Sequence, residues 1–308
     1  MKILSAVLWI LLAASASAQD FTQLAALYDY DKTASLTFER KELDHRAGYK
    51  AWSIRFALPK AGTMTGYLVT PDVPSRAASS CHPAIVWMHS SGAIGFLGDA
   101  VLMAKAGAVS MIVQSVDGLP SADAEDAKNQ SIADIVGLRR AADILQSRAD
   151  VDPARLAFVG HSYGSMMGAV AISVDSRFRA AVFEVGLLGM SIHIGTSPGA
   201  WATGVRKDLG DKLPHFLDVL SIVDDKNYIG HAPAIPKLFQ SAWYDPGVPH
   251  SDAEDFFNLA TGPKQLKWYD SGHDIDDPAA AIDRARFLAE HLHLPDIGRV
   301  LDNGRPRR

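Results

Sequence analysis

The segment Gly160-His161-Ser162-Tyr163-Gly164 constrains this chain more than any other part of its sequence. A short apolar run ends at Val159, and small and apolar residues at helical spacing follow the segment, so the pattern predicts a strand, a tight turn and a helix. Glycines two places on either side of Ser162 let the strand and the helix approach closely. We therefore expect Ser162 to occupy a strained turn and to stand exposed at the carboxyl edge of a sheet.

Strand and helix patterns alternate along most of the chain. Residues 83–89 form a continuous apolar run, which is typical of a strand buried on both faces. Further strands are predicted near residues 109–115, 178–186, 235–243 and 265–269. Amphipathic helices are predicted near residues 98–108, 132–145, 252–259 and 278–292. This order indicates an α/β fold with a mostly parallel, twisted sheet of about eight strands and helices on both faces.

Two alternating runs, at residues 51–57 and 62–71, predict an antiparallel hairpin before the parallel part of the sheet. We expect an N-terminal lead-in at residues 19–48, one large domain at 49–294 and a C-terminal tail at 295–308. Residues 187–232 are less regular and are predicted to form a small cap-like insertion. An insertion above a sheet edge often shapes a substrate pocket, and an ordinary packed helical excursion is the alternative.

The N-terminus has the pattern of a secretory signal peptide. Lys2 is followed by an apolar run too short to span a bilayer comfortably, and Ala16-Ser17-Ala18 matches an A-x-A cleavage site. We expect residues 1–18 to be removed and the mature protein to be secreted or periplasmic; an uncleaved membrane anchor is the alternative. No later segment is apolar enough for stable insertion in a membrane.

Composition excludes several classes of site. The formal net charge of -5 gives no support to a nucleic-acid partner. Cys81 is the only cysteine, so the chain can form neither an intramolecular disulfide nor a cysteine-based zinc site. The sequence contains no G-x-G-x-x-G, P-loop or H-E-x-x-H signature, so we expect no cofactor and no catalytic metal.

Two downstream residues complete a set that chemistry requires around a nucleophilic serine. A serine hydroxyl needs a histidine to take its proton, and that histidine needs a carboxylate to fix its tautomer. Asp245 and His273 follow Ser162 in the chain, and each comes just beyond a predicted parallel strand. Because the carboxyl ends of parallel strands meet at one edge of a sheet, these three residues form the predicted catalytic triad.

Several residues compete for the roles of acid and base. Glu184 ends an earlier predicted strand and is the main alternative acid, with Asp270 and Asp274 behind it. The other histidines weighed as the base have less suitable positions; they are His89, His161, His250, His291 and His293.

An acyl-transfer site also needs donors for the oxyanion of its tetrahedral intermediate. The backbone N–H of Tyr163, directly after Ser162, is the first predicted donor. The second is expected from the turn after His89, where Ser90 and Ser91 are the candidates.

These motifs resemble those of secreted α/β-hydrolases of the dienelactone-hydrolase-like group, which is related to the catalytic domains of acetyl xylan esterases and prolyl oligopeptidases. The resemblance covers roughly residues 50–293 and rests on the segments 151–164, 243–249 and 269–273. The order Ser, acid, His is also that of the α/β-hydrolases. Ser90 departs from the family, which commonly has glycine there.

The resemblance implies an α/β-hydrolase fold and a serine hydrolase that cleaves a small carboxylic ester or lactone through an acyl-enzyme. A serine peptidase of the prolyl-oligopeptidase type is the second reading, because the roughly 30 residues before the first hairpin are too few for the accessory domain of those peptidases. A catalytically silent binding protein of the same fold is the third.

Overall fold

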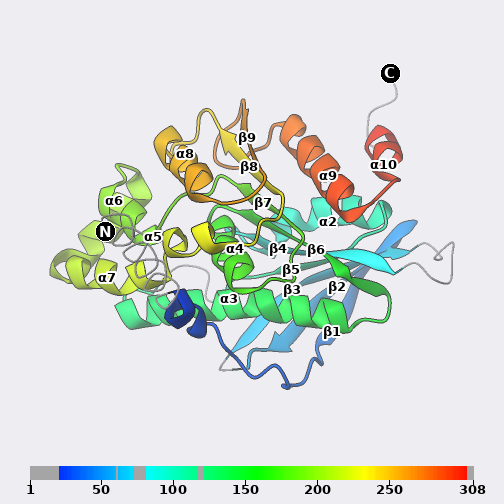
Figure 1. The fold of residues 1–308 in the computed structure, drawn as a ribbon, viewed down its shortest axis with the longest axis horizontal. Helices are drawn as coiled ribbons and strands as arrows, with labels where there is room; N and C mark the ends of the chain where they lie inside the picture. The colour runs from blue at the N-terminus through cyan, green and yellow to red at the C-terminus, as the bar shows by residue number, and fades with distance from the viewer. Residues whose placement is uncertain (1–20, 60–61, 73–80, 117–120, 304–308) are drawn as a thin grey trace, which may run out of the picture.

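The computed structural model describes residues 21–59, 62–72, 81–116 and 121–303 (Figure 1). The predicted signal peptide and the basic segment 304–308 lie outside these residues. In the described part, nine strands form one sheet in the order β1-β2-β3-β5-β4-β6-β7-β8-β9. The strands are β1 Glu39–Arg46, β2 Gly48–Ala57, β3 Thr63–Asp72, β4 His82–His89, β5 Val109–Val113, β6 Val151–His161, β7 Ala180–Glu184, β8 Lys237–Ala242 and β9 Lys264–Tyr269.

The sheet is mostly parallel, as the sequence predicts. β4 pairs in parallel with β5 and β6, and β6, β7, β8 and β9 continue the parallel series. β1, β2 and β3 are antiparallel neighbours, and β3 joins them to β5. The predicted hairpin is β2 and β3. The ninth strand, β1, lies within the expected lead-in; its residues are nearly all charged and exposed, so they give no alternating pattern, as suits an edge strand.

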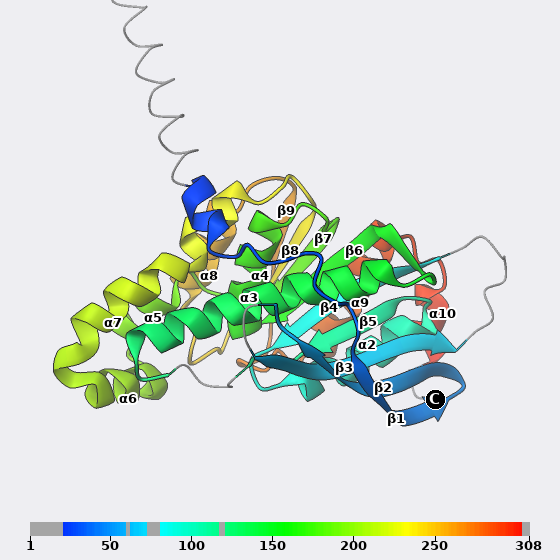
Figure 2. The same ribbon diagram turned by 90° about the horizontal axis from the view of Figure 1, so that it is seen from below.

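Helices cover both faces of the sheet (Figure 2). One apolar core lies between the sheet and α3, α4 and α8, and a second lies between the sheet and α2 and α9. The helices are α2 Leu97–Lys105, α3 Ala124–Ser147, α4 Tyr163–Val174, α5 Met190–Thr196, α6 Ala200–Leu209, α7 Leu213–Leu220, α8 His250–Leu259, α9 Pro278–Leu292 and α10 Ile297–Asn303. None of the described helices is both long and apolar enough to cross a membrane.

Two helices depart from the prediction. α3 begins at Ala124, two turns before the expected start, because the Asp123 side chain caps the amides of Glu125 and Asp126 at 3.0 and 3.1 Å. The only apolar residues of this first part of α3 are Ala124 and Ala127, so the sequence shows no clear amphipathic pattern there. α10 lies in the expected tail, where Ile297 and Leu301 pack against the core beside α2 and α9.

The insertion at 187–232 is a packed helical unit at one end of the sheet (Figure 1). Ile194 of α5 and Phe216 and Leu220 of α7 share an apolar cluster with Ala124 and Ala127 of α3. The insertion therefore rests on the N-terminal end of α3, from which its inner residues reach the carboxyl edge of the sheet.

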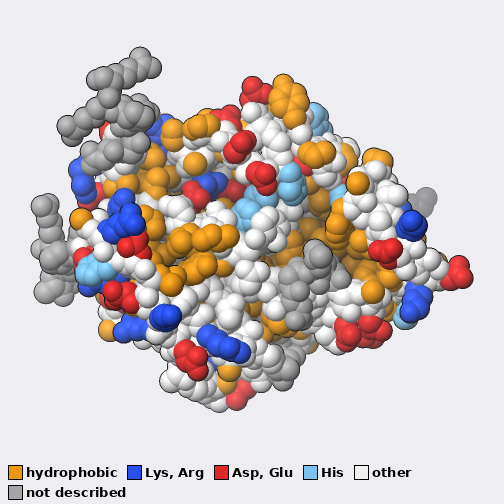
Figure 3. All heavy atoms as spheres, turned by 180° about the vertical axis from the view of Figure 1, so that it is seen from behind, with side chains coloured by type: hydrophobic (Ala, Val, Ile, Leu, Met, Phe, Trp, Pro, Cys, Tyr) orange, Lys and Arg blue, Asp and Glu red, His pale blue; other side chains and the backbone are white. Residues whose placement is uncertain are grey.

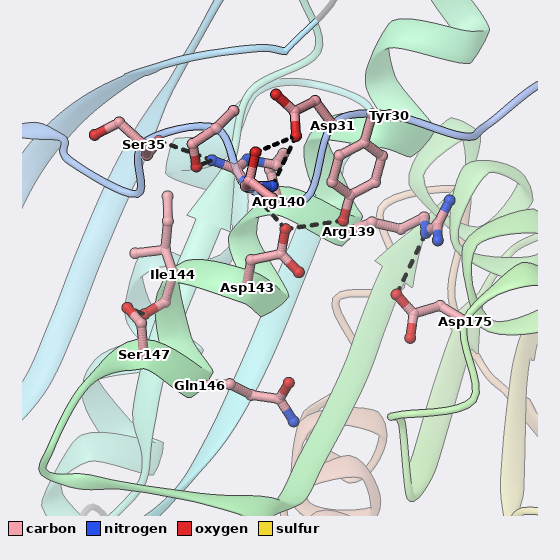
Figure 4. Close-up of polar contacts among 12 residues, drawn as sticks. Tyr30, Asp31, Ser35, Arg139, Arg140, Asp143, Ile144, Gln146, Ser147 and Asp175 are labelled. Atoms are coloured by element: carbon pink, nitrogen blue, oxygen red, sulfur yellow. Dashed lines mark hydrogen bonds and ion pairs between the residues drawn. The ribbon is translucent and has the colours of Figure 1, made fainter.

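The lead-in is held on α3 by arginine side chains (Figure 4). Arg139 donates to the carbonyl of Tyr28 at 2.6 Å, and Arg140 donates to the carbonyl of Ser35 at 2.8 Å. The Tyr30 hydroxyl donates to Asp143 at 2.9 Å. These bonds satisfy backbone carbonyls that no regular structure would pair. The described part of the lead-in therefore packs on α3.

Candidate active site

Ser162 sits in a tight turn between β6 and α4. Its φ of 53° is in the left-handed region, which is unfavourable for a residue with a side chain. A Cβ atom on Gly160 would lie 2.5 Å from the carbonyl carbon of Gly164, and one on Gly164 would lie 2.0 Å from the carbonyl oxygen of Met88. The two glycines are therefore required by close backbone approach, and the turn presents the Ser162 hydroxyl beyond the end of the strand.

The structure brings Ser162, His273 and Asp245 into one hydrogen-bonded chain. His273 Nε2 lies 2.9 Å from Ser162 Oγ, and His273 Nδ1 lies 2.8 Å from Asp245 Oδ2. The three residues follow β6, β9 and β8, so the carboxyl ends of the parallel strands place them together. With Nδ1–H donating to the carboxylate, Nε2 is free to accept the serine proton.

Asp245 is fixed and ionised by its surroundings. Burial opposes its charge, but the hydrogen bond from His273 and those from two backbone amides outweigh burial and hold the pKa of Asp245 below its usual value. The amides of Gly247 and Val248 donate to Oδ1 at 2.7 and 3.0 Å. The carboxylate therefore remains charged at neutral pH and selects one tautomer of His273.

Glu184, the main alternative acid, has a different partner. Its carboxylate forms an ion pair with Arg284 of α9, and Arg284 also binds Asp99 of α2 at 2.6 Å. Only the backbone of Glu184 meets the site, since its carbonyl accepts the Ser162 amide at 2.8 Å. The described residues give no hydrogen bond between His273 and Glu184, Asp270 or Asp274.

The competing histidines also have other contacts. His250 Nε2 donates to the Trp243 carbonyl at 3.0 Å, and His291 packs edge-on against Phe287. His293 follows the last residue of α9 in a left-handed conformation. None of these three is bonded to Ser162.

His161 has a role that the sequence did not reveal. Its Nε2 lies 2.8 Å from the backbone carbonyl of His273 and must donate, because a carbonyl only accepts. In the neutral ring Nδ1 is then the acceptor, and the Ser90 hydroxyl donates to it at 3.1 Å. Burial, followed by the stacked ring of His89, lowers the pKa of His161 to about 3, so the ring is neutral. His161 thus links the loop that carries His273 to the turn after β4 that carries Ser90.

The two candidate donors of that turn differ. The Ser91 amide donates to His89 Nδ1 at 3.0 Å, so it is already engaged, whereas Ser90 lines the cavity with Ser162. As the first residue of α4, Tyr163 has an amide that no carbonyl within its own helix can reach. The geometry therefore favours the amides of Tyr163 and Ser90 over that of Ser91.

A cavity of about 360 Å³ opens above the serine. The insertion contributes Leu187, Met190, His193 and Trp201 to its lining, and Met166 and Val248 also line it. Figure 3 shows a face with histidine side chains near its middle and hydrophobic side chains on either side of them. In the described chain, no three His, Cys, Asp or Glu side chains are grouped in a way that could hold a metal ion. The cavity suits a mainly apolar group of small size.

A family model described as the prolyl oligopeptidase family matches residues 121–292, more than half of the chain. The chain belongs to the prolyl oligopeptidase family. The matched segment contains Ser162, Asp245 and His273, together with the insertion. No curated protein matches the chain significantly.

Solved structures place this family member among the α/β-hydrolases. Acetyl xylan esterase 1 from Thermoanaerobacterium sp. JW/SL YS485 has a TM-score of 0.72 at 17% identity, with 88% of this chain and 93% of that chain covered. The acetyl xylan esterase from Paenibacillus sp. R4 has 0.72 at 19%, with 89% and 94% covered. An acylaminoacyl peptidase has 0.62 at 17%, with 86% and 44% covered. These structures confirm the α/β-hydrolase fold. The family match makes the protein a serine hydrolase, with an ester or a peptide as the class of substrate.

Proposed function

We propose that the protein hydrolyses a small carboxylic ester or lactone, with Ser162 as nucleophile, His273 as base and Asp245 as the acid of the triad. The observation that carries the proposal is the continuous chain of hydrogen bonds from Ser162 Oγ through His273 to Asp245, at 2.9 and 2.8 Å. A binding protein without catalysis would not need this chain intact.

The reaction follows from the geometry. Ser162 Oγ attacks the substrate carbonyl while His273 Nε2 takes its proton, and the resulting oxyanion accepts from the amides of Tyr163 and Ser90. The carbonyl re-forms as the carbon–oxygen bond to the alcohol breaks, and His273 gives its proton to the departing alcohol. Water then attacks the acyl-enzyme by the same steps, releasing the acid and restoring the serine hydroxyl.

An ester is the favoured substrate on two counts. The two acetyl xylan esterases superpose with a higher TM-score than the acylaminoacyl peptidase, 0.72 against 0.62. The cavity lining is mainly apolar, with His193 as a polar residue of the insertion, which suits a small acyl or aryl group. A peptidase remains the second function because the family is that of prolyl oligopeptidase.

The proposal is tested by labelling the purified protein with a fluorophosphonate and mapping the adduct by mass spectrometry. The adduct is expected on Ser162 and should be lost when the label is added after heat denaturation. Turnover is then compared between acetyl and butyryl esters and the matching anilides and proline-containing peptides. Faster cleavage of peptides than of the matching esters would assign a peptidase, and no adduct together with no turnover would contradict a hydrolase.

A further inference from the structure

His193, on the insertion, is a buried histidine whose ring has no hydrogen-bond partner in the described part of the chain. Only 9% of the residue is exposed, and its Nδ1 is both inaccessible to water and unpaired. A neutral imidazole carries one donor and one acceptor, and an unpaired buried polar group costs about 1–3 kcal/mol of stability. The protein's own fold therefore does not explain this side chain.

Two other histidines near the site, buried His161 and half-buried His89, do have hydrogen-bond partners. His161 uses both nitrogens, and His89 Nδ1 accepts the Ser91 amide. His193 differs from both because it lies on the wall of the cavity. Because Nδ1 is closed off, a group that enters the cavity meets the ring at its other nitrogen, Nε2, for which the described residues also give no hydrogen bond.

The surroundings of His193 indicate the shape of that group. Its ring stacks on Trp201, with centroids 5.9 Å apart and planes at 23°. Met166 and Met190 also line the cavity, and thioethers make favourable contacts with aromatic rings. Flat aromatic and thioether walls favour a planar, apolar group such as an aryl ring.

His193 is held in place from the start of its helix. The Gly189 amide donates to Asp225 at 2.7 Å, and the Ser191 amide donates to Asp224 at 3.1 Å. Both aspartates are buried, with 0 and 2% of their surfaces exposed. Because α5 is fixed at its N-terminus, the ring faces the cavity as part of a formed wall.

The charge state of His193 restricts the ligand further. Burial lowers the pKa of His193, against the opposing charges of Asp252 and Asp245, while His273 and Arg206 act with burial. Whichever tautomer the neutral ring adopts, a hydroxyl can pair with its Nε2, because a hydroxyl both donates and accepts. It matches a carboxylate poorly, since that would require the imidazolium form.

We propose that His193 is a specificity-determining residue that hydrogen-bonds a hydroxyl carried by an aryl group of the substrate. Trp201 would pack against that aryl group. The proposal rests on the proposed function, because it places the aryl group in the cavity above Ser162. It predicts a preference for hydroxyaryl esters over the same esters without the hydroxyl.

The test uses substrate pairs that differ by one hydroxyl. One pair carries it on the acyl side, methyl phenylpropanoate and its meta and para hydroxyphenyl analogues, and the other on the alcohol side, phenyl acetate and its hydroxyphenyl analogues. His193→Phe keeps a flat ring and removes both nitrogens, and His193→Gln keeps a donor and an acceptor. His215→Phe, at an exposed position of α7 in the same insertion, is the matched control.

In the wild type, kcat/KM should favour a hydroxylated ester about tenfold over its parent in at least one pair, the size expected for one hydrogen bond. His193→Phe should reduce that ratio to about one, whatever its effect on the rate of the parent ester. His193→Gln should retain part of the preference, and His215→Phe all of it.

Stability gives an independent readout. His193→Phe should be at least as stable as the wild type, because it removes an unpaired polar group from a buried position. A ratio that is unchanged in a folded His193→Phe protein, or a wild type with no hydroxyl preference in either pair, would overturn the proposal. Loss of turnover on every ester, with no fluorophosphonate adduct, would instead overturn the proposed function and this inference with it.

Discussion

The carboxyl edge of the sheet and the insertion above it differ in whether their buried polar groups have hydrogen-bond partners. At the sheet edge, His273 and His161 each use both ring nitrogens in hydrogen bonds within the protein. In the described insertion, His193 uses neither, and Asp225 Oδ2 is also buried without a partner. The difference indicates that the triad is held by the protein before a substrate arrives, whereas the ring of His193, on the cavity wall, is not held by hydrogen bonds of the described chain.

The largest expected effect on turnover is at the carboxyl edge of the sheet. Ser162→Ala deletes the nucleophile from an exposed turn and should lower ester turnover by about 10⁴-fold or more while leaving the fold intact. Turnover and thermal unfolding are measured on the same preparation. Wild-type turnover in this variant would show that the hydrogen-bonded chain is not the catalytic device.

A slightly smaller effect is expected at the acid. Asp245→Asn leaves the packing in place but presents the wrong tautomer of His273, so kcat should fall by about 10³- to 10⁴-fold. The matched control is Glu184→Gln, which disturbs the pair with Arg284 and should act mainly on stability. A variant pair in which Glu184→Gln loses kcat and Asp245→Asn does not would reverse the assignment of the acid.

His161 should have an intermediate effect, because it positions other groups and does not touch the substrate. His161→Phe removes the bonds to the His273 carbonyl and the Ser90 hydroxyl, and kcat should fall by about 10- to 100-fold with little change in KM. His161→Gln, which keeps a donor and an acceptor, should recover part of the loss.

If His161 acts partly through Ser90, the effects of His161→Phe and Ser90→Ala on kcat should be less than additive. Strictly additive effects would mean that His161 does not act through Ser90. Its effect on kcat would then come from its hydrogen bond to the His273 carbonyl alone.

The smallest effect concerns pH and stability. Burial is the main reason that the pKa of His89 is lowered to about 4 and that of His161 to about 3. An unfolded histidine titrates near about 6.5, so between about pH 6.5 and 4 the unfolded chain binds protons that the folded chain does not. The two histidines should therefore lower stability as pH falls through this window, by on the order of 2 kcal/mol. Buried Asp224 and Asp225, whose pKa values are raised by burial, act in the opposite direction, so the effect of a histidine is measured by its variant.

Urea unfolding at several pH values checks this. His161→Phe should show a shallower pH dependence than the wild type above pH ~5, where the carboxylates with lowered pKa, such as Asp245 and Asp175, have not begun to contribute. Equal slopes for the two proteins would mean that His161 is charged in the folded state.

The parts of the molecule that sequence reasoning predicted are those with local causes. The turn motif itself predicts the close backbone approach at Gly160 and Gly164. α9 runs from Pro278 to Leu292 as predicted, because its apolar residues recur every three or four positions. The positions of Asp245 and His273 follow from where parallel strands end.

What could not be predicted depends on contacts between distant segments. The sequence gives His161 no suitable position as a base, and its link to His273 spans 112 residues. His193 lies in a segment without a regular pattern, so only the folded insertion shows that its ring is buried and unpaired. β1 lacked a signal for the opposite reason, since its charged residues suit an edge that faces water.

The long helix α3 has a consequence for how relatives of this protein can diverge. Asp134 on this helix holds the Tyr163 hydroxyl at 3.0 Å, and Arg139 and Arg140, a little over one turn later, hold the lead-in. Adding or deleting one residue between Asp134 and Arg139 would rotate the two arginines by about 100° around the helix axis relative to Asp134. Over evolution, gaps should therefore accumulate in the loops between elements, while the spacing from Asp134 to Arg140 stays constant even where the side chains themselves are exchanged.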